Sequence, residues 1–90
     1  MLKNLEQLIQ TIRERKKSSP DYSYTNKLLK DKNLNILKIK EEIEELFEAV
    51  KEDSNKTHEA ADVIYHLMVY LESNNIKIED VMEELKKRQK

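Results

Sequence analysis

The feature that most constrains this chain is that its 90 residues contain no glycine and only one proline. Tight hairpin turns need backbone with positive φ, which glycine supplies most easily, so a sheet built from hairpins is disfavoured. The Gly-rich loops that bind phosphates or dinucleotides are excluded outright. A chain rich in Leu, Ile, Glu and Lys is instead typical of helices. The sequence therefore predicts a single all-α domain over residues 1–90.

Apolar residues recur at steps of three and four along most of the chain, which is the spacing of one helix face. We expect helices over residues 2–17, 23–29, 34–52, 56–73 and 78–89. The helix over 56–73 has the widest apolar surface and should be the most buried. We expect a break at 18–21 because Pro20 disfavours helical backbone at Ser19.

The polar connections between these segments also carry predictions. Residues 31–33 are expected to form a turn, and residues 53–55 to end one helix and cap the next. Asn75 stands where glycine commonly ends a helix, because asparagine tolerates left-handed backbone. A chain this short has a limited core, and several helices have apolar residues on more than one side. We therefore expect a bundle of four to five helices that is completed by homodimerisation.

Charge is distributed unevenly although the net charge is only −1. Residues 1–40 hold ten Lys and Arg against four Asp and Glu, whereas residues 41–62 hold nine acidic against two basic side chains. No excess of base favours nucleic acid as a partner. There is no cysteine for disulfides or thiolate sites, no apolar run long enough for a membrane span, and no signal peptide at residues 1–6. We expect a soluble cytoplasmic protein in which a cation bridges to an anionic ligand.

Four carboxylates could form the cation site. Glu42 and Glu45 lie three apart on one helix, and the small Ala49 leaves room beside them. Glu59 and Asp62 have the same spacing on the next helix. If the two helices pack antiparallel, all four carboxylates converge with no Lys or Arg between them. Oxygen ligands of this kind favour Mg²⁺ or Mn²⁺.

A plainer interpretation stays open, because Glu-rich helix faces are usually just solvated. Asp62 argues against it, since a carboxylate among apolar neighbours is costly unless it is paired or bound to a metal. His66 shares the flank of Glu59 and Asp62, but a lone histidine is more often a satisfied core residue than a ligand. The four tyrosines are expected to be packing residues.

These strings resemble a known family. Glu41-Glu42-x-x-Glu45 followed by Glu59-x-x-Asp62 is similar to the metal motif of the all-α, MazG-like nucleoside triphosphate pyrophosphohydrolases. Ser23-Tyr24-Thr25 and Tyr65-His66 resemble, more narrowly, the phosphoribosyl-ATP pyrophosphohydrolases of histidine biosynthesis. The resemblance implies hydrolysis of phosphoribosyl-ATP to phosphoribosyl-AMP and pyrophosphate, the second step of that pathway, by a homodimer with Mg²⁺ on Glu42, Glu45, Glu59 and Asp62.

Further roles follow for the neighbouring residues. Glu41 is the candidate general base or support for the ligands. The expected contacts to phosphate and ribose are Arg15, Lys16, Ser23, Tyr24, Lys27 and Lys38. Two alternatives remain: a MazG-like house-cleaning hydrolase of non-standard nucleotides, which shares the metal site, and a non-catalytic helical interaction module, in which the acids are merely solvated.

Overall fold

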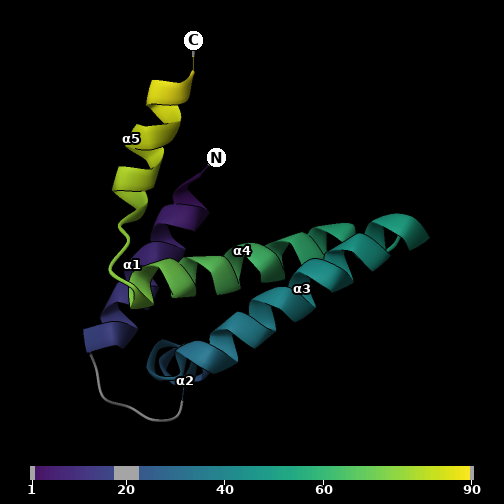
Figure 1. The fold of residues 1–90 in the computed structure, drawn as a ribbon, viewed down its shortest axis with the longest axis horizontal. Helices are drawn as coiled ribbons and strands as arrows, with labels where there is room; N and C mark the ends of the chain where they lie inside the picture. Colours follow the sequence, from purple (N-terminus) through teal and green to yellow (C-terminus); the bar gives the residue numbers. More distant parts are fainter. Residues whose placement is uncertain (1, 18–22, 90) are drawn as a thin grey trace.

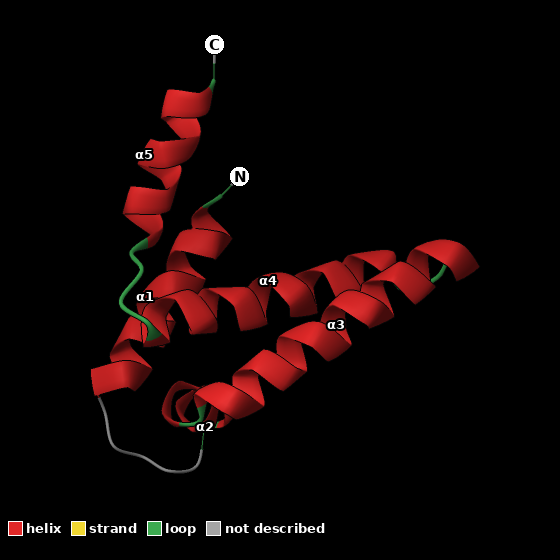
Figure 2. Cartoon of the chain, viewed as in Figure 1, coloured by secondary structure: helices red, strands yellow, loops and turns green. Residues whose placement is uncertain are grey.

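The computed structural model describes residues 2–17 and 23–89, and over this part of the chain it is all-helical (Figure 1, Figure 2). The helices are α1 (Lys3–Lys17), α2 (Tyr24–Lys30), α3 (Lys32–Glu52), α4 (Lys56–Ser73) and α5 (Ile78–Arg88). The predicted all-α class and the positions of the five helices are confirmed. The break expected at residues 18–21 lies outside the described residues. No described helix combines the length and the apolar character that a membrane crossing requires.

Helix α4 is the centre of the fold and packs against each of the other four helices. α3 and α4 form a long antiparallel pair, and α1 and α5 lie at the end of α4 away from the α3–α4 turn (Figure 1). The small apolar core sits at that end, where α1, α2 and α4 meet. Its buried side chains are Ile9, Ile12, Leu28, Met68 and Val69.

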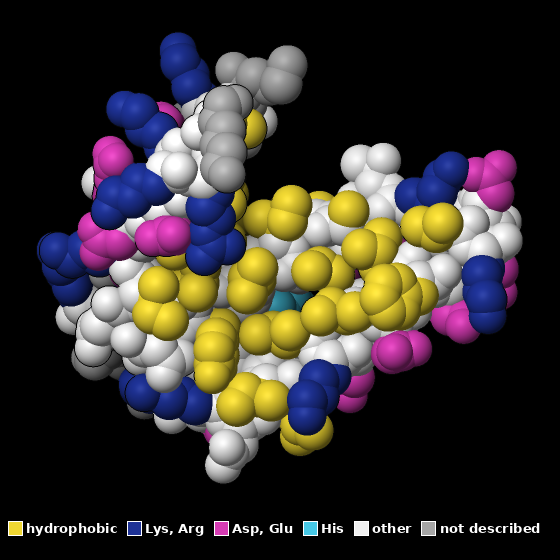
Figure 3. Space-filling model, turned by 45° about the horizontal axis from the view of Figure 1, so that its top comes forward, with side chains coloured by type: hydrophobic (Ala, Val, Ile, Leu, Met, Phe, Trp, Pro, Cys, Tyr) yellow, Lys and Arg dark blue, Asp and Glu magenta, His cyan; other side chains and the backbone are white. Residues whose placement is uncertain are grey.

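Helix α4 has the most buried residues of the described helices, as expected, but part of its apolar surface is exposed. Met68 and Val69 are buried, but Ile64 is 46% and Leu67 39% exposed. On α3, the large apolar side chains of Leu37, Phe47 and Val50 are exposed too. Figure 3 shows hydrophobic side chains gathered over α3 and α4 on one face of the molecule. The single chain therefore leaves an apolar face uncovered.

The turn expected at residues 31–33 is wrong, because Asp31 alone separates α2 from α3. The backbone N–H of Asp31 donates to the carbonyl of Lys27 and closes α2. Its side chain accepts a hydrogen bond of 3.0 Å from the N–H of Leu34 and opens α3. One residue thus serves as cap for both helices, so Lys32 and Asn33 are helical.

The turn between α3 and α4 uses left-handed backbone instead of glycine. Asp53 and Asn55 have φ values of 54° and 56°, and Asn75, before α5, has 57°. The prediction for Asn75 is confirmed. Asn55 starts α4 without a side-chain cap bond, so its role there is conformational and the expected cap is absent.

One core side chain lacks partners. Asn35 of α3 is completely buried, and neither its amide nitrogen nor its amide oxygen makes a hydrogen bond. An unpaired buried amide costs about 1–3 kcal/mol of stability. Asn35 therefore weakens the packing of α3.

An ionic network holds α5 at the C-terminal end of α4. The Arg13 guanidinium donates to Glu72 at 3.2 Å and to both carboxylate oxygens of Glu79 at 2.9 and 2.7 Å. Lys16 donates to the carbonyl of Glu72 and to the side chain of Asn75. The Glu79 carboxylate raises the pKa of Arg13, and the guanidinium lowers the pKa of Glu79 to about 2. These contacts join α1, the end of α4 and the start of α5.

Candidate active site

The antiparallel packing of α3 and α4 brings the predicted carboxylates together. Glu42, Glu45 and Glu59 each offer a ligand atom within 4.8 Å of the others. Asp62 lies one turn after Glu59 on α4 and is close enough to raise the pKa of both Glu42 and Glu59. The two helices thus bring Glu42, Glu45 and Glu59 together, with Asp62 beside Glu59.

The cluster is electrostatically strained in the free chain. Burial is the main cause that raises the pKa of Glu42 to about 7, followed by the charge of Glu45 and a hydrogen bond with it. The pKa of Glu59 is raised as well, by burial and then by Glu45. One carboxylate oxygen of Glu42 and one of Glu59 are buried without any hydrogen-bond partner. Such oxygens are well suited to a cation, which would relieve the repulsion and supply the missing partner.

Space for a ligand adjoins the cluster. A depression of about 280 Å³ at the α3–α4 turn has Glu45 and Glu59 in its wall, together with Ala49. Ala49 is buried, and its methyl group leaves room that a larger side chain would fill. The expectation of open space beside the carboxylates is confirmed.

A hydrogen-bonded chain supports the site from α2. His66 Nδ1 lies 2.7 Å from the carbonyl oxygen of Asp62, and His66 Nε2 lies 2.9 Å from the Tyr24 hydroxyl. A carbonyl only accepts, so Nδ1 carries the proton and Nε2 accepts from Tyr24. Both ring nitrogens of the buried His66 are occupied, which confirms that it is a satisfied core histidine. The ring of Tyr65 packs against those of Tyr24 and His66, as expected of packing residues.

Several predicted substrate contacts lie around Tyr24. The charges of Lys38, Glu41 and Glu42 all act on the Tyr24 hydroxyl, whose pKa is raised chiefly by burial. Lys38 Nζ lies 3.2 Å from a carboxylate oxygen of Glu41, so Glu41 is paired with Lys38 and lies outside the groups of mutually close ligand atoms.

Ser23 caps α2 by accepting a hydrogen bond of 2.9 Å from the N–H of Asn26. Lys27 is exposed on the same short helix. The Ser23-Tyr24-Thr25 string thus has a clear structural use, since Thr25 also bonds the hydroxyl of Tyr65. In this cap bond Ser23 Oγ is the acceptor.

The other two predicted contacts lie elsewhere. Lys16 is bound to Glu72 and Asn75 at the end of α4, ten residues beyond Asp62 and so about 15 Å away along the helix. The backbone carbonyl of Arg15 accepts a hydrogen bond from Asn26, which ties α1 to α2. Within one chain, neither residue is brought to the carboxylates.

The sequence reasoning missed His58. Its Nε2 lies 3.4 Å from a carboxylate oxygen of Asp62, and His58, Glu59 and Asp62 form a second group of ligand atoms within 4.8 Å of one another. The missed signal is the four-residue spacing of His58 and Asp62, which puts both side chains on one face of α4.

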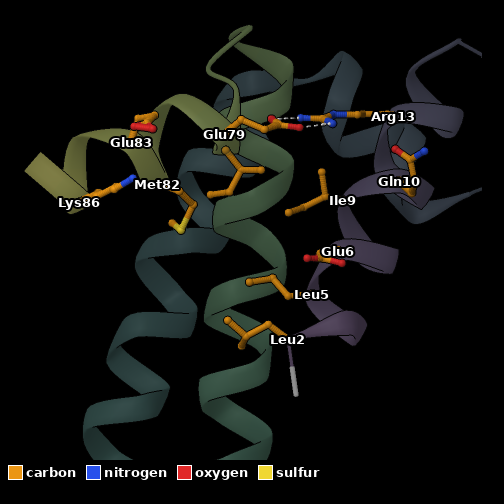
Figure 4. A pocket seen from close by; sticks show the side chains of 11 residues that line it. Leu2, Leu5, Glu6, Ile9, Gln10, Arg13, Glu79, Met82, Glu83 and Lys86 are labelled. Atoms are coloured by element: carbon orange, nitrogen blue, oxygen red, sulfur yellow. Dashed lines mark hydrogen bonds and ion pairs between the residues drawn. The ribbon is translucent and has the colours of Figure 1, made fainter.

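A larger cavity, of about 710 Å³, lies between α1 and α5, away from the carboxylates. Leu2, Leu5 and Ile9 line it from α1, and Met82 lines it from α5 (Figure 4). The Arg13–Glu79 ion pair closes one side of it. Its walls are mainly apolar, so the carboxylate cluster is the better candidate for a triphosphate substrate.

Comparison with known proteins identifies the family. The family of phosphoribosyl-ATP pyrophosphohydrolases matches residues 5–89. A phosphoribosyl-ATP pyrophosphatase of Haloarcula marismortui is 38% identical, over 93% of this chain and 91% of its own length. That of Nitrosospira multiformis is 44% identical, over 94% and 73%. A histidine biosynthesis trifunctional protein of Candida albicans is 35% identical over 92% of this chain, which corresponds to 10% of its own length. The chain belongs to the phosphoribosyl-ATP pyrophosphohydrolase family.

Proposed function

We propose that this protein hydrolyses phosphoribosyl-ATP to phosphoribosyl-AMP and pyrophosphate in histidine biosynthesis. In this reaction water attacks the α-phosphorus, and the bond to the bridging oxygen of the β-phosphate breaks. The observation that carries the proposal is the cluster of Glu42, Glu45 and Glu59 in a chain that matches this family over residues 5–89. A cytoplasmic location belongs to the same proposal.

The cation of this reaction is proposed to be Mg²⁺, held by Glu42, Glu45, Glu59 and Asp62. The residues fit it, because two buried carboxylate oxygens lack partners and these four side chains offer oxygen ligands. When bound, Mg²⁺ would neutralise triphosphate charge and polarise water. With a cation bound, the negative charge of the carboxylates would no longer repel an anionic substrate.

The chain's own side chains would orient the substrate from the α2 side. Lys38 lies beside Tyr24 and can exchange its bond to Glu41 for one to a phosphate oxygen. Ser23 and Lys27 are proposed contacts on the same side, and Glu41 is the proposed base because it is not among the ligands. Arg15 and Lys16 reach this site only if they come from a partner subunit.

We also propose a homodimer. The exposed apolar side chains of α3 and α4 would be covered by the same face of a second copy, which is the self-complementary contact of a two-fold axis. A two-fold partner would also give the small core more apolar surface to bury.

The test is pyrophosphate release from phosphoribosyl-ATP with and without Mg²⁺, beside dUTP and dCTP as substrates. We expect turnover of phosphoribosyl-ATP alone, and only with the cation. Turnover of dUTP or dCTP in preference would identify a house-cleaning hydrolase. No turnover of any of them, and no specific cation binding in calorimetry, would identify an interaction module and overturn the proposal.

A further inference from the structure

His58 gives the carboxylate cluster a nitrogen donor. The two groups of mutually close ligand atoms, one of Glu42, Glu45 and Glu59 and one of His58, Glu59 and Asp62, share Glu59. His58 therefore adjoins the carboxylate cluster through Glu59 and Asp62. Its imidazole is 72% exposed, so it is accessible to an ion that enters from solvent.

We propose that His58 is a ligand of the divalent cation at this site and makes the site prefer Mn²⁺ to Mg²⁺. This inference rests on the metal site of the proposed function. Two adjacent ligand atoms on one octahedral ion lie about 3 Å apart when each bond is about 2.1 Å long. The 3.4 Å between His58 Nε2 and the Asp62 carboxylate is close to that separation.

The local helix geometry favours chelation. Residues four apart lie one above the other on a helix face, and this spacing lets a pair of side chains on one helix bind the same metal. His58 and Asp62 have this spacing, and Glu59 lies between them in the sequence. One carboxylate oxygen of Glu59 is buried and has no hydrogen-bond partner, so it is able to accept a cation.

The chemistry of the donor set decides the preference. Mg²⁺ takes oxygen ligands almost exclusively, whereas imidazole suits transition metals, and Mn²⁺ accepts both carboxylate and imidazole. A site of carboxylates with one imidazole therefore binds Mn²⁺ more tightly than the carboxylates alone would, with little gain for Mg²⁺.

Two measurements on the full chain test this inference. Pulsed electron paramagnetic resonance of the Mn²⁺-loaded protein detects a directly bound nitrogen, and labelling of histidine with nitrogen-15 assigns it to imidazole. Calorimetry gives the dissociation constants for Mn²⁺ and Mg²⁺. The variants are His58→Asn and, as a matched control on the neighbouring exposed position, Thr57→Asn. Asp62→Asn reports on the metal site itself.

We expect one imidazole nitrogen on Mn²⁺ in the unmodified chain and in Thr57→Asn, and none in His58→Asn. The preference for Mn²⁺ over Mg²⁺ should fall about tenfold in His58→Asn. Binding of Mn²⁺ that Asp62→Asn abolishes, but without bound nitrogen or any change of preference in His58→Asn, overturns the role of His58 and keeps the metal site. Failure of both cations to bind overturns the metal site and the role of His58 together.

Discussion

The two ends of α4 treat a carboxylate in opposite ways. Glu72, at the C-terminal end, is buried and paired with Arg13, while Lys16 donates to its backbone carbonyl. Glu59, about 20 Å away along the helix, has one buried oxygen with no partner and three further acidic side chains around it. The first arrangement is complete within the protein. In the second, a buried carboxylate oxygen of Glu59 has no hydrogen-bond partner and could bind a cation. This difference separates a structural contact from a candidate site.

The largest effect is expected from a substitution of a proposed metal ligand near Glu59. Asp62→Asn should lower pyrophosphate release at least 100-fold, on the order that follows from losing a metal ligand. Without metal its midpoint of thermal unfolding should hold or rise, because an amide is cheaper than a crowded carboxylate. Activity within about threefold of the unmodified chain would refute the ligand role.

The next effect concerns the exposed face between the two ends. Leu67→Glu should convert a particle of twice the chain's 10.8 kDa into one of 10.8 kDa in light scattering. Leu67 is partly exposed in the single chain, so a charge there disturbs the proposed dimer more than the fold. Glu83→Gln on α5 is the control and should leave the mass unchanged. An active unmodified chain that scatters as a monomer would contradict the dimer.

Neutralising one carboxylate at each end should change stability in opposite directions. Glu72→Gln removes one of the two carboxylate partners of Arg13 and should lower the free energy of unfolding by about 1–2 kcal/mol, since the pair is only partly buried. Glu59→Gln removes the repulsion between Glu59 and the neighbouring carboxylates, so it should raise the free energy of unfolding in the absence of metal. Urea unfolding of both variants measures the difference. Equal destabilisation by both changes would show that Glu59 is a structural residue like Glu72.

The pH dependence should show the same contrast. The folded-state pKa of Glu42, about 7, lies above its ordinary value of 4.5, so the metal-free chain should lose stability as pH rises from 4.5 to 7. Because the site is open to solvent, we expect on the order of 1 kcal/mol. The pKa of Glu79, about 2, lies below its ordinary value, so its contribution is present above pH 4.5 and is lost as pH falls towards 2.

Stability of the metal-free chain should therefore be highest near pH 4.5. Thermal unfolding between pH 3 and 8 measures this, and saturating Mg²⁺ should remove the loss on the alkaline side. A metal-free midpoint that rises steadily from pH 4.5 to 7 would contradict the strained cluster.

The smallest effect is expected at Asn35, where a missing hydrogen-bond partner can be tested without a change of charge. Asn35 is buried and unpartnered like the Glu59 oxygen, but it is neutral. Asn35→Leu should raise the free energy of unfolding by about 1 kcal/mol, because it removes an unsatisfied amide. This gain should be the same at pH 5 and 8 and with or without Mg²⁺. A gain that depends on Mg²⁺ would place Asn35 in the site.

The sequence by itself determined the fold class and most of the site. Without glycine and with apolar residues at helical spacing, the chain has few alternatives to helices, and the intervals within Glu42–Glu45 and Glu59–Asp62 predicted one acidic cluster between antiparallel helices. The turn expected at residues 31–33 was wrong because the polarity of these residues does not show that one residue, Asp31, can cap both helices.

Only the tertiary structure decided which charged side chains have partners. The sequence predicts that Lys16, in the basic segment, contacts phosphate. The packing of α1 on the end of α4 instead places it where it donates hydrogen bonds to Glu72 and Asn75. His58 looks like a solvated residue, but the pairing of α3 with α4 places Glu42 and Glu45 next to the Glu59 that it adjoins. Helical spacing fixes which side chains share a face, because it depends on local geometry. Partners across helices depend on the crossing of α1, α3 and α4, which arises from burial of the whole core.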